Sequence, residues 1–394
     1  MTRKATPPAG SWEVSVADGV GAIDEATWDR LANPDPKRRN PTLRHAFFRA
    51  LEGSGSISPE AGWLPQHLLA READGPVRAI LPLYLKAHSF GEYVFDQGWA
   101  EAYERHGLDY YPKLLSAVPV TPVPGRRFLT GDDGGASLET LATAIRQIVG
   151  RQRLSSAHVT FLEEGEADVL SRLGWLLRTG QQFHWPNAGY GDFEAFLGTL
   201  ASRKRKALRR ERREALSPGL SIEWLSGRDI TEAHWDAFFA FYTDTGSRKW
   251  GAPYLNRTFF SLLGEAMSED ALLVMCRRDG RYVAGALNLI GGDALYGRYW
   301  GCIEAHPFLH FEVCYYQAID FAIHHKLARV EAGAGGDHKL VRGYVPAPTY
   351  SAHWIADPRF RHAIDDYLVR ERRYVAEESE ALGALGPYRR GERS

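Results

Sequence analysis

A glycine-rich segment, Glu331-Ala-Gly-Ala-Gly-Gly-Asp337-His338-Lys339, follows an apolar stretch that is predicted to form a strand. Glycine allows close backbone approach to a ligand and positive φ values. Glu331, Asp337 and His338 are residue types that can take a proton from a reacting group. Lys339 and Arg342 can hold an anion. We therefore predict catalytic roles for the first three residues and substrate contacts for the last two. The alternative is a tight loop with a solvated polar tip.

A second group of polar and aromatic side chains occurs in the first half of the chain, where residues 98–110 are predicted to form a loop. Aromatic and charged residues together are typical of ligand recognition. The alternative is a structured loop that caps a sheet. The substrate-binding residues predicted here are Asp96, Trp99, Tyr103, Tyr110, Tyr111 and Lys113.

A basic run follows residue 202, and it surrounds a predicted helix almost completely. A helix with this much positive charge repels itself, which favours a polyanionic partner. Donor phosphates or tRNA fit this description, and a solvated helix balanced by acidic neighbours is the alternative. An RNA-associated protein is a further hypothesis, and it requires binding that weakens steeply with salt. The predicted phosphate-binding residues are Arg203, Lys204, Arg205 and Lys206.

Composition narrows the classes of protein further. The chain has 394 residues and a formal net charge of −1. The overall charge therefore does not favour binding to nucleic acid or to a membrane. Its 3 cysteines show no C-x-x-C spacing, so neither a disulfide framework nor a zinc knuckle is predicted. His306 and His310 are separated by Pro307, and no metal site is expected. Without an apolar signal segment or a membrane-length apolar run, a cytoplasmic location is expected.

The periodicity of apolar residues predicts an α/β chain of mixed strands and helices. We expect a first lobe at 11–180, a second lobe at 181–356, and a C-terminal helix and tail at 357–394. The predicted strands cover 12–16, 66–71, 77–85, 93–95, 158–162, 220–225, 271–277, 283–290, 294–300 and 328–332. The predicted helices cover 24–31, 45–51, 138–151, 193–216, 234–245, 257–267, 311–324 and 361–385.

Three features recur in the same order in both halves of the chain. An Asp-Gly turn (Asp74-Gly75 and Asp279-Gly280), a tyrosine (Tyr93 and Tyr299) and a Tyr-Tyr pair (Tyr110-Tyr111 and Tyr315-Tyr316) follow one another at nearly equal offsets. This recurrence favours a duplicated architecture.

Specific stretches of the sequence resemble a bacterial family of Fem-like predicted N-acyltransferases, over residues of about 12–354. They are Tyr84–Ser89, Gly91–Asp96, Tyr110–Leu114, Ser202–Lys206, Tyr296–Gly301, Glu331–Ala334, His338–Leu340, Arg342–Tyr344 and Thr349–Trp354. The resemblance implies two tandem GNAT-like lobes, as in the Fem-type peptidyltransferases. It also implies transfer of an acyl or aminoacyl group to an amine, linked to peptidoglycan precursors.

In the GNAT scheme a splayed strand offers a backbone N–H to the reacting carbonyl, and the resemblance assigns this strand to residues 296–300. Arg298, Trp300 and Tyr344 become candidate substrate contacts. The segment after this strand, 301–310, lacks the paired glycines that wrap a pyrophosphate. The donor is therefore left open between an acyl-CoA and an aminoacyl-tRNA. The alternative function is a non-catalytic recognition module for a cell-wall precursor or another anionic ligand. The sequence predicts no oligomeric state.

Overall fold

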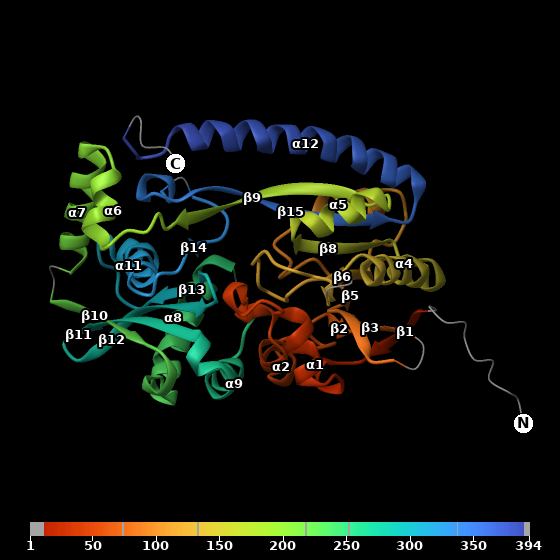
Figure 1. The fold of residues 1–394 in the computed structure, drawn as a ribbon, viewed down its shortest axis with the longest axis horizontal. Helices are drawn as coiled ribbons and strands as arrows, with labels where there is room; N and C mark the ends of the chain where they lie inside the picture. Colours follow the sequence, from red (N-terminus) through yellow and green to blue (C-terminus); the bar gives the residue numbers. More distant parts are fainter. Residues whose placement is uncertain are drawn as a thin grey trace, which may run out of the picture. The chain divides into compact units, whose positions relative to one another are not determined.

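The computed structural model describes residues 12–72, 75–131, 134–216, 219–250, 253–336 and 338–389 (Figure 1). The chain divides into two compact units. Unit 1 contains residues 1–34, 43–180 and 349–373, and unit 2 contains residues 35–42, 181–348 and 374–394. Residues 390–394 of the predicted C-terminal tail, and Asp74, lie outside the described residues.

Unit 1 carries two sheets. One has the strand order β1-β3-β4-β7 and is antiparallel, and the other has the order β15-β8-β6-β5-β2 with β6 and β8 parallel. Its strands are β1 (Trp12–Ala17), β2 (Trp63–Pro65), β3 (His67–Glu72), β4 (Val77–Leu81), β5 (Tyr84–Lys86), β6 (Lys113–Ser116), β7 (Leu129–Thr130) and β8 (Ser156–Leu162). Its helices are α1 (Glu25–Ala32), α2 (His45–Gly53), α3 (Gln97–Arg105), α4 (Gly134–Gln152) and α5 (Glu164–Arg172).

Unit 2 has a sheet in the order β10-β11-β12-β13-β14-β9, in which β13 and β14 are the parallel pair. Its strands are β10 (Leu220–Leu225), β11 (Ala271–Arg278), β12 (Arg281–Ile290), β13 (Ala294–Cys302) and β14 (Arg329–Glu331). Its helices are α6 (Phe193–Thr199), α7 (Ser202–Leu216), α8 (Glu232–Trp250), α9 (Arg257–Met267), α10 (Leu309–Phe311), a π-helix (Glu312–Tyr316) and α11 (Gln317–His324). The elements β9 (Leu176–Pro186), β15 (Val345–Ile355) and α12 (Pro358–Ala384) each contain residues of both units.

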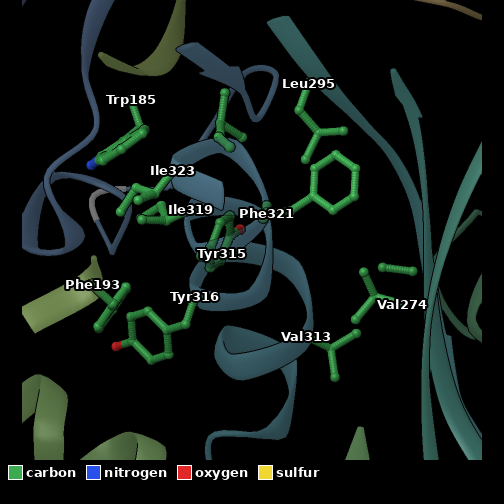
Figure 2. Packing of buried hydrophobic residues seen from close by; sticks show 14 of the residues in the cluster. Trp185, Phe193, Val274, Leu295, Val313, Tyr315, Tyr316, Ile319, Phe321 and Ile323 are labelled. Carbon is green, nitrogen blue, oxygen red and sulfur yellow. The ribbon is translucent and has the colours of Figure 1, made fainter. Parts of the chain in front are cut away.

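The core of unit 2 forms around α11. Its apolar face packs on the sheet next to β13 and β14, and Figure 2 shows Trp185, Leu295, Ile319, Phe321 and Ile323 gathered there. Burial of such side chains from water is the main favourable term in folding. Helix α11 therefore holds β13 and β14 in place from one face of the sheet. Side chains that point to the opposite face do not belong to this core.

Several predicted elements are wrong or incomplete. Residues 98–110 contain helix α3, whose buried Trp99 and Tyr103 share one face, so the aromatic spacing was helical. Residues 93–95 form no strand: residues 93 and 94 are bends, and Tyr93 has a positive φ of 58°. The predicted helix 193–216 is two helices, because Leu200 has extended backbone between α6 and α7. Strands β9 and β15 and helix α5 were not predicted.

The proposed repeat is also wrong at the level of individual residues. Tyr299 lies in strand β13, whereas Tyr93 lies in a bend. Tyr110 and Tyr111 lie in an irregular segment before β6, whereas Tyr315 and Tyr316 belong to the π-helix. The matching tyrosines therefore occupy different elements of the fold.

We predict that Gly301→Ala destabilises the protein by about 1–3 kcal/mol. A Cβ at Gly301 would collide with the backbone carbonyl of Phe241, where α8 packs closely on β13. Chemical denaturation measures the free energy of unfolding. Gly150→Ala on the exposed side of α4 is the control, since nothing lies within 4 Å of its added Cβ. Equal stabilities of the two variants would contradict this account of the α8 contact.

Candidate functional site

Strands β13 and β14 pair over only three residues and then separate. The pairs are Ala294↔Arg329, Leu295↔Val330 and Tyr296↔Glu331, while β13 itself continues to Cys302. Beyond Glu331 the chain follows β9, because Ala332 N donates to Phe183 O at 3.1 Å. We call this divergence of β13 and β14 beyond Tyr296 and Glu331 the wedge.

An irregularity in β13 lies at the start of the wedge. On β12, Leu287 pairs with Tyr299 but its neighbour Asn288 pairs with Gly297, so Arg298 is an extra residue. Such a bulge bends a strand, increases its local twist and is common next to active sites. The bulge therefore lies where the pairing of β13 with β14 has ended, within residues 296–300.

Three polar side chains form a row across the sheet at the last pair before the wedge. Tyr296, Glu331 and His184 stand in register on β13, β14 and β9. The preceding row is Leu295, Val330 and Trp185, and it packs into the core. Because side chains alternate between faces of a strand, the polar row lies on the opposite face.

Glu331 is buried with only one of its oxygens hydrogen-bonded. Arg329 Nε donates to Oε1 at 2.8 Å, whereas Oε2 has no hydrogen-bond partner among the described residues. His184 Nε2 lies 3.7 Å from Oε2. Burial raises the pKa of Tyr296, and the charge of Glu331 raises it further. The row thus contains a carboxylate with an available oxygen next to an imidazole.

Lys339 supports the glycine-rich loop after Glu331. Its buried ammonium donates to the carbonyl oxygens of Ala332 at 2.8 Å, Gly333 at 3.1 Å and Ala334 at 3.0 Å. Burial lowers the pKa of Lys339 to about 8. The structure therefore places this lysine among backbone carbonyls rather than facing an anion. Asp337 lies outside the described residues.

The other residues predicted near the wedge come together in an aromatic cluster. Tyr315 OH and His338 Nε2 are 3.0 Å apart, and the ring of Tyr315 lies 5.6 Å from that of Tyr344. The ring of Trp300 lies 5.2 Å from that of His310, which in turn is 6.3 Å from that of His338. Helix segments with π hydrogen bonding, as in residues 312–316, are frequent at functional sites.

Two arginines complete the predicted set. The buried Arg342 lies over the ring of Phe311 at 3.5 Å and donates to Glu211 Oε2 and to His338 O, both at 2.6 Å. Arg298, the bulge residue, lies over the ring of Tyr299 at 5.0 Å. Arg342 is thus a buried connection between α7 and the His338 segment, whereas Arg298 marks the start of the wedge.

Helix α7 carries its charge unevenly. Near its end, Arg212 pairs with Glu312 at 2.9 Å and Asp320 at 2.6 Å, and Arg209 pairs with Glu194. Its first turns contain the four predicted phosphate ligands, of which Arg203 and Lys206 are exposed and Lys204 and Arg205 half-buried. Within the described part of the chain, none of these four forms an ion pair with a carboxylate. The first turns of α7 therefore present net positive charge.

Four of the first-lobe residues form a buried network around Lys113. Its ammonium donates to Glu92 Oε2 at 2.8 Å, to Ser89 Oγ at 2.8 Å, and to Asp96 Oδ2. Tyr110 OH donates to the same oxygen of Asp96 at 2.6 Å, and Tyr111 OH lies 2.8 Å from Ser89 Oγ. Lys113 thereby fastens the loop 89–96 to strand β6.

The charges of this network depend on one another. Burial disfavours the ammonium of Lys113, but Glu92 and Asp96 outweigh it and raise the pKa of the lysine. Burial likewise opposes ionisation of Asp96, yet Lys113 holds the pKa of Asp96 below its usual range. Burial raises the pKa of Glu92 to about 7. Lys86, which pairs with Lys113 across β5 and β6, has a pKa lowered by burial to about 7.

Trp99 and Tyr103 lie beside this network without bonding to Lys113. Trp99 contacts the ring of His353 edge-on at 4.9 Å, and His353 Nδ1 is 2.7 Å from His158 Nδ1. Tyr103 stacks on Phe360 at 4.0 Å. The predicted first-lobe residues are therefore mostly core side chains. The exposed side chains of the fastened loop are Phe90, Tyr93 and Phe95.

Sequence reasoning missed His184, Tyr296, Glu92, His158 and His353. The signals were weak, since His184 and His353 lie on strands that were not predicted. Tyr296 and Glu92 each stood within a quoted stretch, but neither showed a partner in sequence. Pairing between distant strands supplies those partners.

The described residues contain no group of three or more His, Cys, Asp or Glu side chains that could hold a metal ion. Among the described residues, none of the helices combines the length and the apolar character that crossing a membrane would need.

The FemAB-like family model, described as peptidoglycan biosynthesis/recognition, matches residues 19–390. The structure of FemX is similar with a TM-score of 0.56 and 15% identity, covering 87% of this chain and 98% of FemX. The structure of L-PGS from Bacillus licheniformis is similar with a TM-score of 0.50 and 10% identity, covering 89% of this chain and 98% of that one. No curated protein matches the sequence.

These likenesses show the fold. They confirm the predicted class, a mixed α/β fold that is similar to that of FemX over most of both chains.

We predict that Lys113→Met destabilises the protein by about 3–5 kcal/mol, because it leaves buried carboxylates without their cation. Lys86→Met is the matched control. Among the described residues, the ammonium of Lys86 forms hydrogen bonds to His88 Nδ1 and Phe90 O, both at 3.3 Å, and lies over the ring of Trp63, but it forms no ion pair with a carboxylate. Its loss should cost about 1 kcal/mol. Urea denaturation measures both. A control that loses as much stability as Lys113→Met would show that the carboxylates do not depend on Lys113.

Proposed function

The chain belongs to the FemAB-like family of peptidoglycan biosynthesis and recognition proteins, and on that premise we propose that it transfers an acyl or aminoacyl group to an amine at the wedge of unit 2. The observation that supports this site is the divergence of β13 and β14 beside the buried carboxylate of Glu331. Transfer of an acyl group to an amine needs a proton acceptor and donors for the carbonyl oxygen. The wedge offers both kinds of group within a few residues.

The bulged strand has the first role in this proposal. Backbone N–H groups of β13 beyond Tyr296 would donate to the carbonyl oxygen as negative charge develops on it. Such donors are already in place before reaction, so they stabilise the transition state without reorganisation. Arg298 and Trp300 would contact the acyl group or its carrier from the same stretch of β13.

The segment after Glu331 has the second role. Glu331 would provide the negative charge that proton removal from the amine requires. Lys339 would hold the glycine-rich loop, and Arg342 would support His338 and the aromatic cluster that includes Tyr344. His338, and Asp337 beyond the described residues, stay candidates for proton transfer in this proposal.

The donor we favour is an aminoacyl-tRNA rather than an acyl-CoA. Support comes from the first turns of α7, where Arg203, Lys204, Arg205 and Lys206 present charge that no carboxylate in the described ranges neutralises. Nucleic-acid phosphates are bound by such charge. A cytoplasmic location fits this donor and the absence of C-x-x-C spacing among the 3 cysteines of the sequence.

The acceptor we favour is the amine of a peptidoglycan precursor. Its support is the family description. In unit 1, the loop 89–96 would contribute to binding this acceptor. The residues that hold this loop in place are Asp96, Tyr110, Tyr111 and Lys113. Trp99 and Tyr103 would support the same loop from α3.

A transfer assay tests the proposal directly. The protein is incubated with either aminoacyl-tRNA or an acyl-CoA, together with a UDP-linked peptidoglycan precursor, and the product is identified by mass. We expect the precursor to gain one aminoacyl group from the tRNA. Binding of the precursor without turnover under any donor would contradict the proposal and favour the recognition module.

We predict that Glu331→Gln lowers the transfer rate by about 10²-fold, the lower end of general-base contributions. Asp293→Asn is the matched control, because Asp293 binds the same guanidinium as Glu331, from Arg329, at 2.6 Å. The control should retain most activity if the negative charge at the wedge is what matters. Similar losses in both variants would indicate that Arg329 is merely a structural link.

We predict that replacing Arg203, Lys204, Arg205 and Lys206 with glutamine weakens tRNA binding and reduces its salt dependence. Removing four phosphate contacts to single strands should reduce the slope of log K against log salt by about 3. Replacing the paired Arg209 and Arg210 with glutamine is the control on the same helix. An unchanged slope in the fourfold variant would show that these residues do not contact the tRNA.

A further inference from the structure

His184 is the member of the polar row that a bound molecule can reach. Its side chain is 17% exposed, compared with 6% for the side chain of Glu331, and Tyr296 is only 2% exposed. Strand β9 places His184 directly beside Glu331, one strand further from β13. The carboxylate is therefore covered, whereas the imidazole next to it is accessible.

The contacts of His184 leave it able to accept a proton. Its Nε2 lies 3.4 Å from Gln182 Oε1 and 3.7 Å from Glu331 Oε2, so this nitrogen faces two oxygen acceptors. A proton on Nε2 suits that environment, because both neighbours accept hydrogen bonds. The neutral ring then has its lone pair on Nδ1. Within the described residues, Nδ1 has no hydrogen-bond partner.

The electrostatic surroundings favour the neutral ring before reaction. Burial lowers the pKa of His184, and the positive charges of Arg329 on β14 and Lys339 on the following loop act in the same direction. Glu331 opposes them. Gln182, the other polar neighbour, carries no charge. The imidazole is therefore mostly unprotonated at neutral pH, and an imidazolium formed there would have the free oxygen of Glu331 beside it.

Among the described residues, the other candidates near the wedge are already engaged. Glu331 Oε1 is held by Arg329, and the ammonium of Lys339 is held by three carbonyls. His338 Nε2 is in contact with the hydroxyl of Tyr315. His184 is therefore the residue near the wedge that is both accessible and able to act as a base.

We propose that His184 is the general base of the transfer reaction and that Glu331 is the positioning residue that stabilises its protonated form. This inference rests on the proposed function. In the step, the amine nitrogen attacks the carbonyl carbon of an ester or thioester, and a C–N bond forms. The nitrogen passes its proton to His184. The bond from the carbonyl carbon to the leaving oxygen or sulfur breaks, and His184 returns the proton to that atom.

In this arrangement a carboxylate lies beside a histidine that acts as the base. The two residues are brought together by the pairing of neighbouring strands. A carboxylate beside a histidine fixes the tautomer and stabilises the imidazolium. Strand register places Glu331 beside His184, and Tyr296 beside Glu331, although the three residues are far apart in the sequence or on different strands.

The experiment compares single-turnover transfer by the wild type, His184→Ala, His184→Gln and the control His324→Ala. His324 is an exposed histidine of unit 2 at the end of α11. We expect both His184 variants to lose about 10²–10⁴-fold in rate with little change in KM, the range for general bases. Added imidazole should restore part of the rate of His184→Ala only. Melting temperatures show whether each variant is folded.

The pH dependence provides a readout that a structural role would not change. Because the pKa of His184 is lowered, the wild-type rate should fall as pH decreases below the ordinary histidine range and the ring becomes protonated. The His184 variants should lack this acidic limb. Full activity in folded His184 variants, or a loss that neither imidazole nor pH affects, would overturn the assignment. Absence of transfer by the wild type would instead refute the proposed function itself.

Discussion

The constraint on which unit 2 depends is that β14 can pair with β13 only as far as Glu331. Backbone N–H and C=O groups in a folded protein need partners. After Glu331 those of the following residues find them on β9, as the bond from Ala332 N to Phe183 O shows. On the other side of the wedge, β13 is bulged at Arg298 and stays with β12. Beyond this point the two strands diverge, and each keeps its partner on the opposite edge, β12 for β13 and β9 for the residues after β14.

Two buried lysines hold the loops that flank the predicted sites, and they do so by different means. Lys113 in unit 1 is neutralised by carboxylates, so its loop is held by charge. Lys339 in unit 2 is surrounded by carbonyl oxygens, and its pKa is lowered by burial, which no carboxylate among the described residues offsets. In both units a cation was predicted to bind a ligand's anion, and the structure shows it bound within the protein instead.

Regular elements with clear periodicity could be predicted, and contacts between distant strands could not. The strand 283–290 and the helix 257–267 carried enough apolar pattern to be recognised. Strand β9 was missed because its burial does not alternate, and with it His184. The tyrosine repeat failed for a related reason, since an aromatic residue suits a strand, a bend or a π-helix equally well. Glu331 was predicted from local sequence, but its partners depend on register.

The choice of donor also follows from backbone geometry after β13. A pyrophosphate is commonly bound by consecutive N–H groups at the start of a helix. Here that start is a three-residue α10 preceded by Phe308 in the left-handed conformation, followed by a π-helix that contains the buried Glu312. A buried carboxylate in the first turns disfavours an anion there, and Arg212 from α7 already neutralises it. The positive charge that remains for phosphates lies at the first turns of α7, on an exposed helix, and this favours a long polyanionic carrier over a compact coenzyme.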